Sequence, residues 1–87
     1  MANYRLFIKP SAVKEIEAIP TRRERRRVVN RIESLADDPR PPGCQKLSGA
    51  DKYRVRQGRY RILYAIRRDD RLIVTVVRVA HRKDAYR

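Results

Sequence analysis

The chain has 87 residues, a length typical of one small domain, and we assign residues 1–87 to a single domain. Its 23 lysine and arginine residues outnumber 10 acidic residues and give a net charge of +13, which indicates a nucleic acid or an acidic protein as partner. The single cysteine excludes an internal disulfide. The sequence has no run of about 18 apolar residues that could span a membrane, and residues 1–9 lack the apolar core of a signal peptide. We therefore expect a cytoplasmic protein with no membrane partner.

The N-terminal half of the sequence predicts one strand and two helices. Residues 3–9 alternate between polar and apolar side chains and predict a short strand. Apolar residues then recur at helical spacing over residues 11–19. A second helix is predicted over residues 21–37, because Thr21 and Glu24 form a capping box at its start. Since only a short break separates the two helices, we expect an αα-hairpin.

The C-terminal half predicts a loop followed by three strands. Residues 38–51 hold three of the five prolines and two of the three glycines, so we expect a loop in which Leu47 is a buried anchor. Residues 52–56 and 59–67 alternate on either side of a glycine turn and predict a hairpin. Residues 72–80 are almost continuously apolar and β-branched, which is typical of a central strand buried on both faces.

These elements give the order β-α-α-β-β-β. We therefore predict an α+β fold in which an αα-hairpin packs on one face of a mainly antiparallel sheet.

The predicted hairpin separates an apolar face from a basic face. We take Gln57 and Gly58 as its two-residue loop, and residues paired across a hairpin lie on the same face of the sheet. One face then carries Tyr53, Val55, Tyr60, Ile62, Tyr64 and Ile66. The opposite face carries two arginine pairs, Arg54 with Arg61 and Arg56 with Arg59. Like charges directly opposite each other destabilise a sheet, which favours a surface that binds a polyanion over a merely solvated basic face.

Two further motifs remain open to more than one interpretation. The run RRERRR, residues 22–27, lies at the start of a predicted helix, where positive charge opposes the helix dipole. It is either a solvated helix face or a second phosphate-contact patch. The only histidine, His81, ends the last strand beside Arg82, with Tyr86 close behind. We favour a site role for this cluster, although His81 and Arg82 would point to opposite faces of a regular strand.

The residue types favour metal-free chemistry on RNA. The sequence has no carboxylate cluster typical of a two-metal nuclease and no glycine-rich phosphate loop, so we expect no metal and no cofactor. RNA can be cut without a metal, because its 2′-hydroxyl can attack the neighbouring phosphate while arginines stabilise the oxyanions. Arginine cannot act as a base. His81 and Tyr86 are the remaining proton carriers, and His81 is better matched to neutral pH.

Two stretches resemble the RelE/ParE superfamily of bacterial toxins from toxin–antitoxin pairs. They are KLSGADKYRVRQGRYRILYAIRRDD and VVRVAHRKDAYR. The resemblance implies the same β-α-α-β-β-β fold. For the RelE branch it implies a toxin that enters the ribosomal A site and cuts mRNA there, and for the ParE branch a toxin that poisons DNA gyrase. We favour the RelE branch, because Arg61, Arg82 and Tyr86 resemble its RNA-cleaving residues, and keep the ParE branch as the alternative.

The resemblance also implies roles and partners. Catalysis is assigned to Arg61, Arg82 and Tyr86, with His81 as an alternative proton carrier. The resemblance also assigns RNA binding to Arg54 and Arg56. Apart from the resemblance, we add Arg59 and Lys52 as RNA-binding candidates. The expected products are a 2′,3′-cyclic phosphate and a 5′-hydroxyl. The implied partners are mRNA and the ribosome, or DNA gyrase under the alternative, together with an acidic antitoxin that forms a hetero-oligomer with the toxin.

Overall fold

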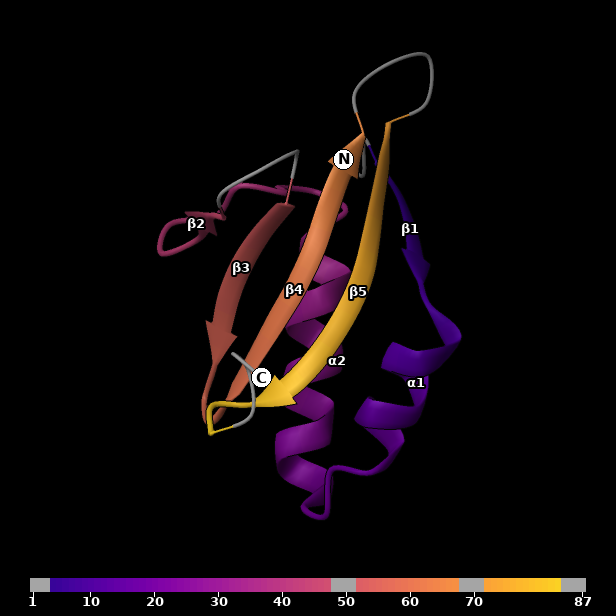
Figure 1. The fold of residues 1–87 in the computed structure, drawn as a ribbon, viewed down its shortest axis with the longest axis vertical. Coiled ribbons are helices and arrows are strands. Elements are labelled where there is room, and N and C mark those ends of the chain that lie inside the picture. Colours follow the sequence, from indigo (N-terminus) through magenta and orange to yellow (C-terminus); the bar gives the residue numbers. More distant parts are fainter. Residues whose placement is uncertain (1–3, 48–51, 68–71, 84–87) are drawn as a thin grey trace.

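A computed structural model of the chain describes residues 4–47, 52–67 and 72–83. The elements in chain order are β1 (Arg5–Ile8), α1 (Pro10–Glu17), α2 (Arg22–Ser34), β2 (Gln45–Lys46), β3 (Lys52–Gln57), β4 (Tyr60–Arg67) and β5 (Ile73–His81). The strands form one sheet in the order β1-β5-β4-β3-β2, and both helices cover the same face of it (Figure 1). The predicted α+β fold is confirmed. The short strand β2, inside the predicted loop, was not foreseen.

The helices differ from their predicted bounds at both ends. Helix α1 begins with Pro10, which suits the first helical position because proline lacks an N–H group. Helix α2 follows Thr21, but the Thr21 side chain makes no capping hydrogen bond, so the predicted capping box is not formed. It ends at Ser34 rather than at residue 37. None of the helices in the described part of the chain is long and apolar enough to cross a membrane.

Strand β5 lies in the middle of the sheet, as predicted. It pairs with β1 in parallel and with β4 antiparallel. Its burial on both faces was predicted wrongly, because the helices cover only one face. Val74 and Val76 on the helix side are fully buried, whereas Ile73 and Thr75 on the opposite face are only half-buried.

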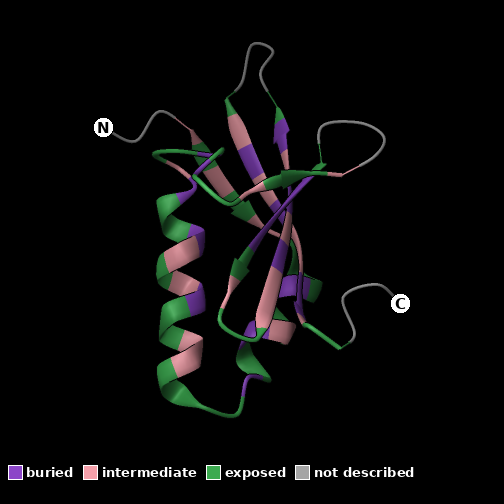
Figure 2. Ribbon diagram, turned by 90° about the vertical axis from the view of Figure 1, so that its left-hand side faces the viewer, coloured by how far each residue is buried: buried purple, intermediate pink, exposed green. Residues whose placement is uncertain are grey.

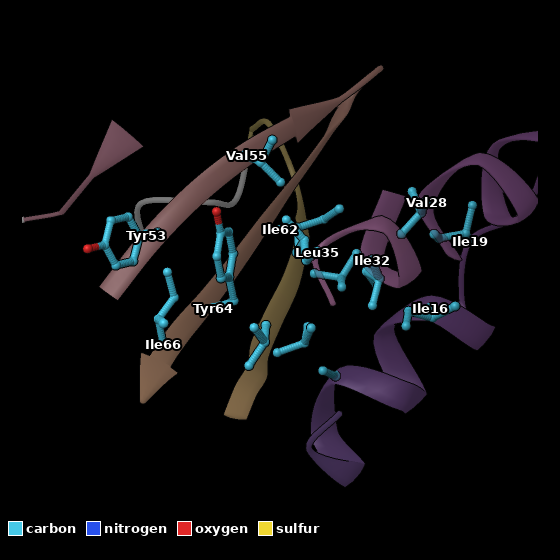
Figure 3. Packing of buried hydrophobic residues seen from close by; sticks show 14 residues of the cluster. Ile16, Ile19, Val28, Ile32, Leu35, Tyr53, Val55, Ile62, Tyr64 and Ile66 are labelled. Carbon is cyan, nitrogen blue, oxygen red and sulfur yellow. The ribbon is translucent and has the colours of Figure 1, made fainter. Parts of the chain in front are cut away.

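The hydrophobic core fills the space between the helices and the sheet (Figure 3). Val28 and Ile32 recur at helical spacing on the side of α2 that faces the sheet, which Figure 2 shows as buried. The predicted apolar face of the hairpin meets them there, and its members Tyr53, Val55, Ile62, Tyr64 and Ile66 are all buried. Full burial of a valine- or isoleucine-sized side chain stabilises a fold by about 1.5–3 kcal/mol. Leu47, the predicted buried anchor, is half-buried.

Candidate functional site

The turn between β3 and β4 lies one residue later than predicted. Gly58 and Arg59 form the turn, and Gln57 pairs with Tyr60. Gly58 has a φ of +59°, whereas no described residue other than glycine has a positive φ. A type II′ turn needs glycine at the first of its two central positions, so Gly58 opens the turn rather than closing it.

This shift changes the arginine pairs but keeps the predicted faces. Each partner on β4 moves by two residues, and side chains alternate along a strand with a period of two. Arg56 therefore lies opposite Arg61, and Arg54 lies opposite Leu63. The predicted pairs of Arg54 with Arg61 and of Arg56 with Arg59 are wrong, because Arg59 is part of the turn.

Three arginines from separate segments line one cavity of about 130 Å³. They are Arg56 at the end of β3, Arg61 near the start of β4 and Arg82 directly after β5, and the cavity also touches Gly58 and Tyr60. We call this the arginine cavity. None of the residues that line it is acidic, so the three positive charges lie together without a carboxylate in the lining.

Hydrogen bonds join the residues after β5 to the hairpin. Nη1 of Arg61 donates to the carbonyl oxygen of Arg82 over 2.8 Å. The backbone N–H of Arg82 in turn donates to the carbonyl oxygen of Arg59 over 2.7 Å. These bonds hold Arg82 beside the hairpin arginines although it is more than 20 residues away from Arg61 in sequence.

Arg54 lies on the same face of the sheet as the arginine cavity but is buried, with 7% of its surface exposed. Nη2 of Arg54 donates to Oε1 of Gln45, a residue of β2 that our sequence analysis missed. Burial lowers the pKa of Arg54, and the positive charges of Arg56 and Arg61 lower it further. Arg54 therefore adds a buried positive charge next to Arg56 and Arg61, and its contact with Gln45 links β2 to β3.

His81 lies apart from the arginine cavity. It pairs with Tyr60, whose ring it meets edge-on with 5.6 Å between ring centroids. Tyr60 belongs to the face of the sheet that the helices cover. His81 also lines a separate cavity of about 290 Å³, beside Glu15 and Arg78. His81, the last residue of β5, thus lies on the helix side, whereas Arg82, directly after β5, lines the arginine cavity, in line with the predicted opposite directions of the two side chains.

The remaining predicted site residues are spread more widely. Lys52 is exposed at the far end of β3 from the turn. Arg59 lines a cavity next to Arg27 of α2, instead of lying on the basic face of the sheet. Tyr86 lies outside the described residues. Within the described ranges, no group of three or more His, Cys, Asp or Glu side chains could hold a metal ion.

Comparison with known proteins identifies the family. A family model described as the ParE toxin of the type II toxin–antitoxin system parDE matches residues 6–86. No curated protein sequence is significantly similar to this chain.

Three solved structures share the fold and about a quarter of the sequence. A chain of the toxin–antitoxin complex RelBE2 from Mycobacterium tuberculosis is 27% identical, with a TM-score of 0.76 over 90% of this chain and 96% of that one. The free E. coli toxin RelE, as a double arginine-to-alanine mutant, is 25% identical, with a TM-score of 0.76 over 99% and 90%. A chain of the RelB–RelE antitoxin–toxin complex from Methanococcus jannaschii is 26% identical, with a TM-score of 0.71 over 92% and 94%. The chain thus belongs to the ParE toxin family of type II toxin–antitoxin systems and is RelE-like in structure.

Proposed function

We propose that this toxin is a ribosome-dependent endonuclease that cuts mRNA in the ribosomal A site and thereby arrests translation. The observation that carries the proposal is the arginine cavity, where Arg56, Arg61 and Arg82 meet without an acidic residue in the lining. Such a site attracts the negative charge of a phosphate, and its lining has no carboxylate that would repel it. The likeness to RelE toxins supports the same function.

In the proposed reaction the RNA supplies its own nucleophile. The 2′-oxygen bonds to the adjacent phosphorus, the bond from phosphorus to the 5′-oxygen breaks, and the products are a 2′,3′-cyclic phosphate and a 5′-hydroxyl. Arg61 and Arg82 stabilise the negative charge that grows on the phosphate oxygens, for which a planar guanidinium is well shaped. Arg56 binds the backbone, and neither a metal nor a cofactor takes part.

The reaction also needs one proton removed from the 2′-hydroxyl and one delivered to the 5′-oxygen. We assign this transfer to Tyr86 ahead of His81, because His81 is not part of the lining of the arginine cavity. A tyrosine could also stack on a base next to the cleaved bond.

The proposed partner outside the ribosome is an acidic antitoxin. The net charge of +13 suits an acidic chain, and two of the structural relatives are toxin–antitoxin complexes. A segment that folds on binding could wrap the toxin, cover its basic surface and form a hetero-oligomer. We place this complex in the cytoplasm, where the ribosome is found.

The proposal is tested by combining Arg61→Ala with Arg82→Ala and assaying mRNA cleavage in a translating extract. We expect the double variant to lose cleavage. The matched control combines Arg22→Ala with Arg26→Ala, which removes the same charge from α2, and should cut like the wild type. If the first double variant cut mRNA as well as the wild type does, the assignment of the site would be wrong.

A second candidate function is inhibition of DNA gyrase without any nuclease activity. The observation that favours it is the match of the ParE toxin family model to residues 6–86. In that case the arginine cavity would be part of a docking surface. Stabilised gyrase–DNA breaks in the absence of mRNA cuts would identify this function.

A further inference from the structure

A second arginine-lined surface is formed by residues of α2 and of the turn that joins β3 to β4. Figure 1 shows where these two elements lie in the fold. It consists of two neighbouring cavities that share Arg27 and Gln57. The larger, of about 390 Å³, is lined by Arg27, Asn30, Arg31, Ser34 and Gln57. The smaller, of about 170 Å³, is lined by Glu24, Arg27, Gln57, Gly58 and Arg59. We call the two together the α2 groove.

The sequence of α2 places one side of the helix along this groove. Arg27, Asn30, Arg31 and Ser34 follow the spacing i, i+3, i+4 and i+7, so they share one face. With a rise of 1.5 Å per residue this stripe is about 10 Å long. Arg22 and Arg26 line neither of these two cavities. The run RRERRR is thus divided, and only part of it lines the groove.

The arginines of the α2 groove are not neutralised within the described chain. Neither Arg27 nor Arg31 forms an ion pair there, and Nε of Arg31 is covered by protein without a hydrogen-bond partner. Glu24 is the one acidic residue in the lining, against three arginines. An anionic ligand in the groove would therefore meet positive charge that no ion pair to Arg27 or Arg31 neutralises within the described residues.

The lining of the larger cavity indicates which anion fits. It offers guanidinium, amide and hydroxyl groups but no apolar side chain. An acidic peptide would find no pocket for the apolar anchors that give protein interfaces most of their affinity. A nucleic acid backbone needs only positive charge and hydrogen-bond donors. Neighbouring phosphates of one strand rise about 3.4 Å along a duplex axis and lie farther apart than that along the backbone, so the stripe could meet about two phosphates.

We propose that the α2 groove binds the phosphodiester backbone of a nucleic acid segment other than the one in the arginine cavity. Gly58 lines both the arginine cavity and the smaller cavity of the groove. The hairpin turn therefore lies between two basic surfaces, one on each side. The inference goes beyond the proposed cleavage and does not depend on it, because binding a backbone requires no reaction.

The test compares two double variants of the full chain that lose the same charge. Arg27→Gln with Arg59→Gln alters the groove, and Arg22→Gln with Arg26→Gln is the control outside its lining. All four side chains are exposed. Binding is measured by fluorescence anisotropy at several salt concentrations. The probes are a labelled single-stranded RNA of about 12 nucleotides and RNA and DNA duplexes of similar length. The probe with the largest groove-dependent loss identifies the kind of nucleic acid bound.

Loss of two phosphate contacts should lower the salt slope for single-stranded RNA by about 1.4, which weakens binding about 25-fold at 0.1 M salt relative to 1 M. For a duplex the slope should fall by about 1.8. The control variant should keep the wild-type slope. Equal losses in both variants, or no loss in the groove variant with any probe, would overturn the proposal. The proposal would also be overturned if a poly-glutamate peptide bound the wild type but not the groove variant, while both proteins bound RNA equally well.

Thermal melting guards against misfolding of the groove variant. If the groove variant has a lower melting temperature than the wild type, the single variant Arg27→Gln replaces it in the binding experiment. Its salt slope for single-stranded RNA should fall by about 0.7. This result is independent of the proposed function. A wild-type toxin that fails to cut mRNA would contradict the nuclease activity and leave the difference in slope between the variants unaffected.

Discussion

Arg61 connects the three segments that form the arginine cavity. It lies opposite Arg56 on β3, and its Nη1 holds the carbonyl oxygen of Arg82. A guanidinium offers five N–H donors in a fixed plane, so one can orient the side chain while others meet a phosphate. The hydrogen bond to Arg82 therefore fixes the orientation of the group that the proposed reaction relies on.

Replacing Arg61 by lysine tests this orientation separately from charge. Arg61→Lys keeps the positive charge but loses the planar fork. We expect mRNA cleavage to fall about 10²–10³-fold, the usual cost of removing one donor to an oxyanion. The control Arg22→Lys on α2 should cut at the wild-type rate. Full activity of Arg61→Lys would show that charge alone suffices at this position.

Gln45 is expected to stabilise the fold through its bond to Arg54. Gln45→Ala removes an acceptor from a guanidinium that is almost fully buried. We expect the free energy of unfolding, measured in urea, to fall by about 1.5–3 kcal/mol, the range for hydrogen bonds to charged groups. Lys46→Ala, on the same short strand and exposed, should have little effect. Equal losses in the two variants would contradict the link between β2 and β3.

Tyr64 should make the stability of the fold depend on pH in alkaline solution. Its hydroxyl is buried and donates to the carbonyl oxygen of Pro39 over 2.7 Å. Burial raises the pKa of Tyr64 well above its usual value, and the neighbouring Cys44 raises it further. A raised folded-state pKa gives stability that is complete below the unfolded pKa of about 10 and is lost as pH rises above it.

Tyr64→Phe should therefore flatten the decline of unfolding free energy above about pH 10. Urea unfolding of both proteins at a series of pH values measures this slope, which is separate from the constant loss caused by the missing hydrogen bond. Tyr60→Phe, at a half-buried position, serves as the comparison. If the unfolding free energies of the wild type and of Tyr64→Phe fell equally steeply with pH, Tyr64 would not be the cause of the alkaline loss of stability.

Among the structural elements, the turn between β3 and β4 positions both basic surfaces. Gly58 opens it with a φ of +59°, and an added Cβ atom would meet no other atom within 4 Å. Any cost of replacing Gly58 would thus come from the backbone conformation alone. Gly58→Ala should lower the unfolding free energy by about 1–2 kcal/mol.

Gly58→Asn separates backbone strain from other causes, because asparagine tolerates a positive φ better than alanine does. We expect urea unfolding to show a smaller loss for Gly58→Asn than for Gly58→Ala. Equal losses would indicate that something other than a positive φ is required at this position.

The helices and strands could be predicted where apolar residues repeat regularly within a single element. Val28 and Ile32 identify the buried side of α2 from sequence alone, and the alternation around Tyr64 identifies the apolar face of the hairpin. The turn register was not predictable, because a shift of two residues leaves every side chain on the same face. A strand as short as β2 has no period to detect, and so the burial of Arg54 beneath Gln45 could not be foreseen.

At the scale of the whole molecule, the buried apolar face of the sheet and the basic surfaces occupy different regions. The helices bury one face of the sheet, and the end of the sheet near the hairpin turn carries arginines on both sides. The composition predicted the excess of positive charge but not its distribution. Only the fold shows that Arg82 meets the hairpin arginines, whereas the alternation of the strand already predicted that His81 and Arg82 point to opposite faces.

The most direct test of the proposed function is induction of the wild-type toxin in growing cells, followed by mapping of mRNA 5′ ends beside a gyrase cleavage assay. We predict new mRNA ends with 5′-hydroxyls at ribosome-bound positions. We predict no stabilised gyrase–DNA breaks. Gyrase–DNA breaks without new mRNA ends would contradict the account and identify the toxin as a gyrase inhibitor.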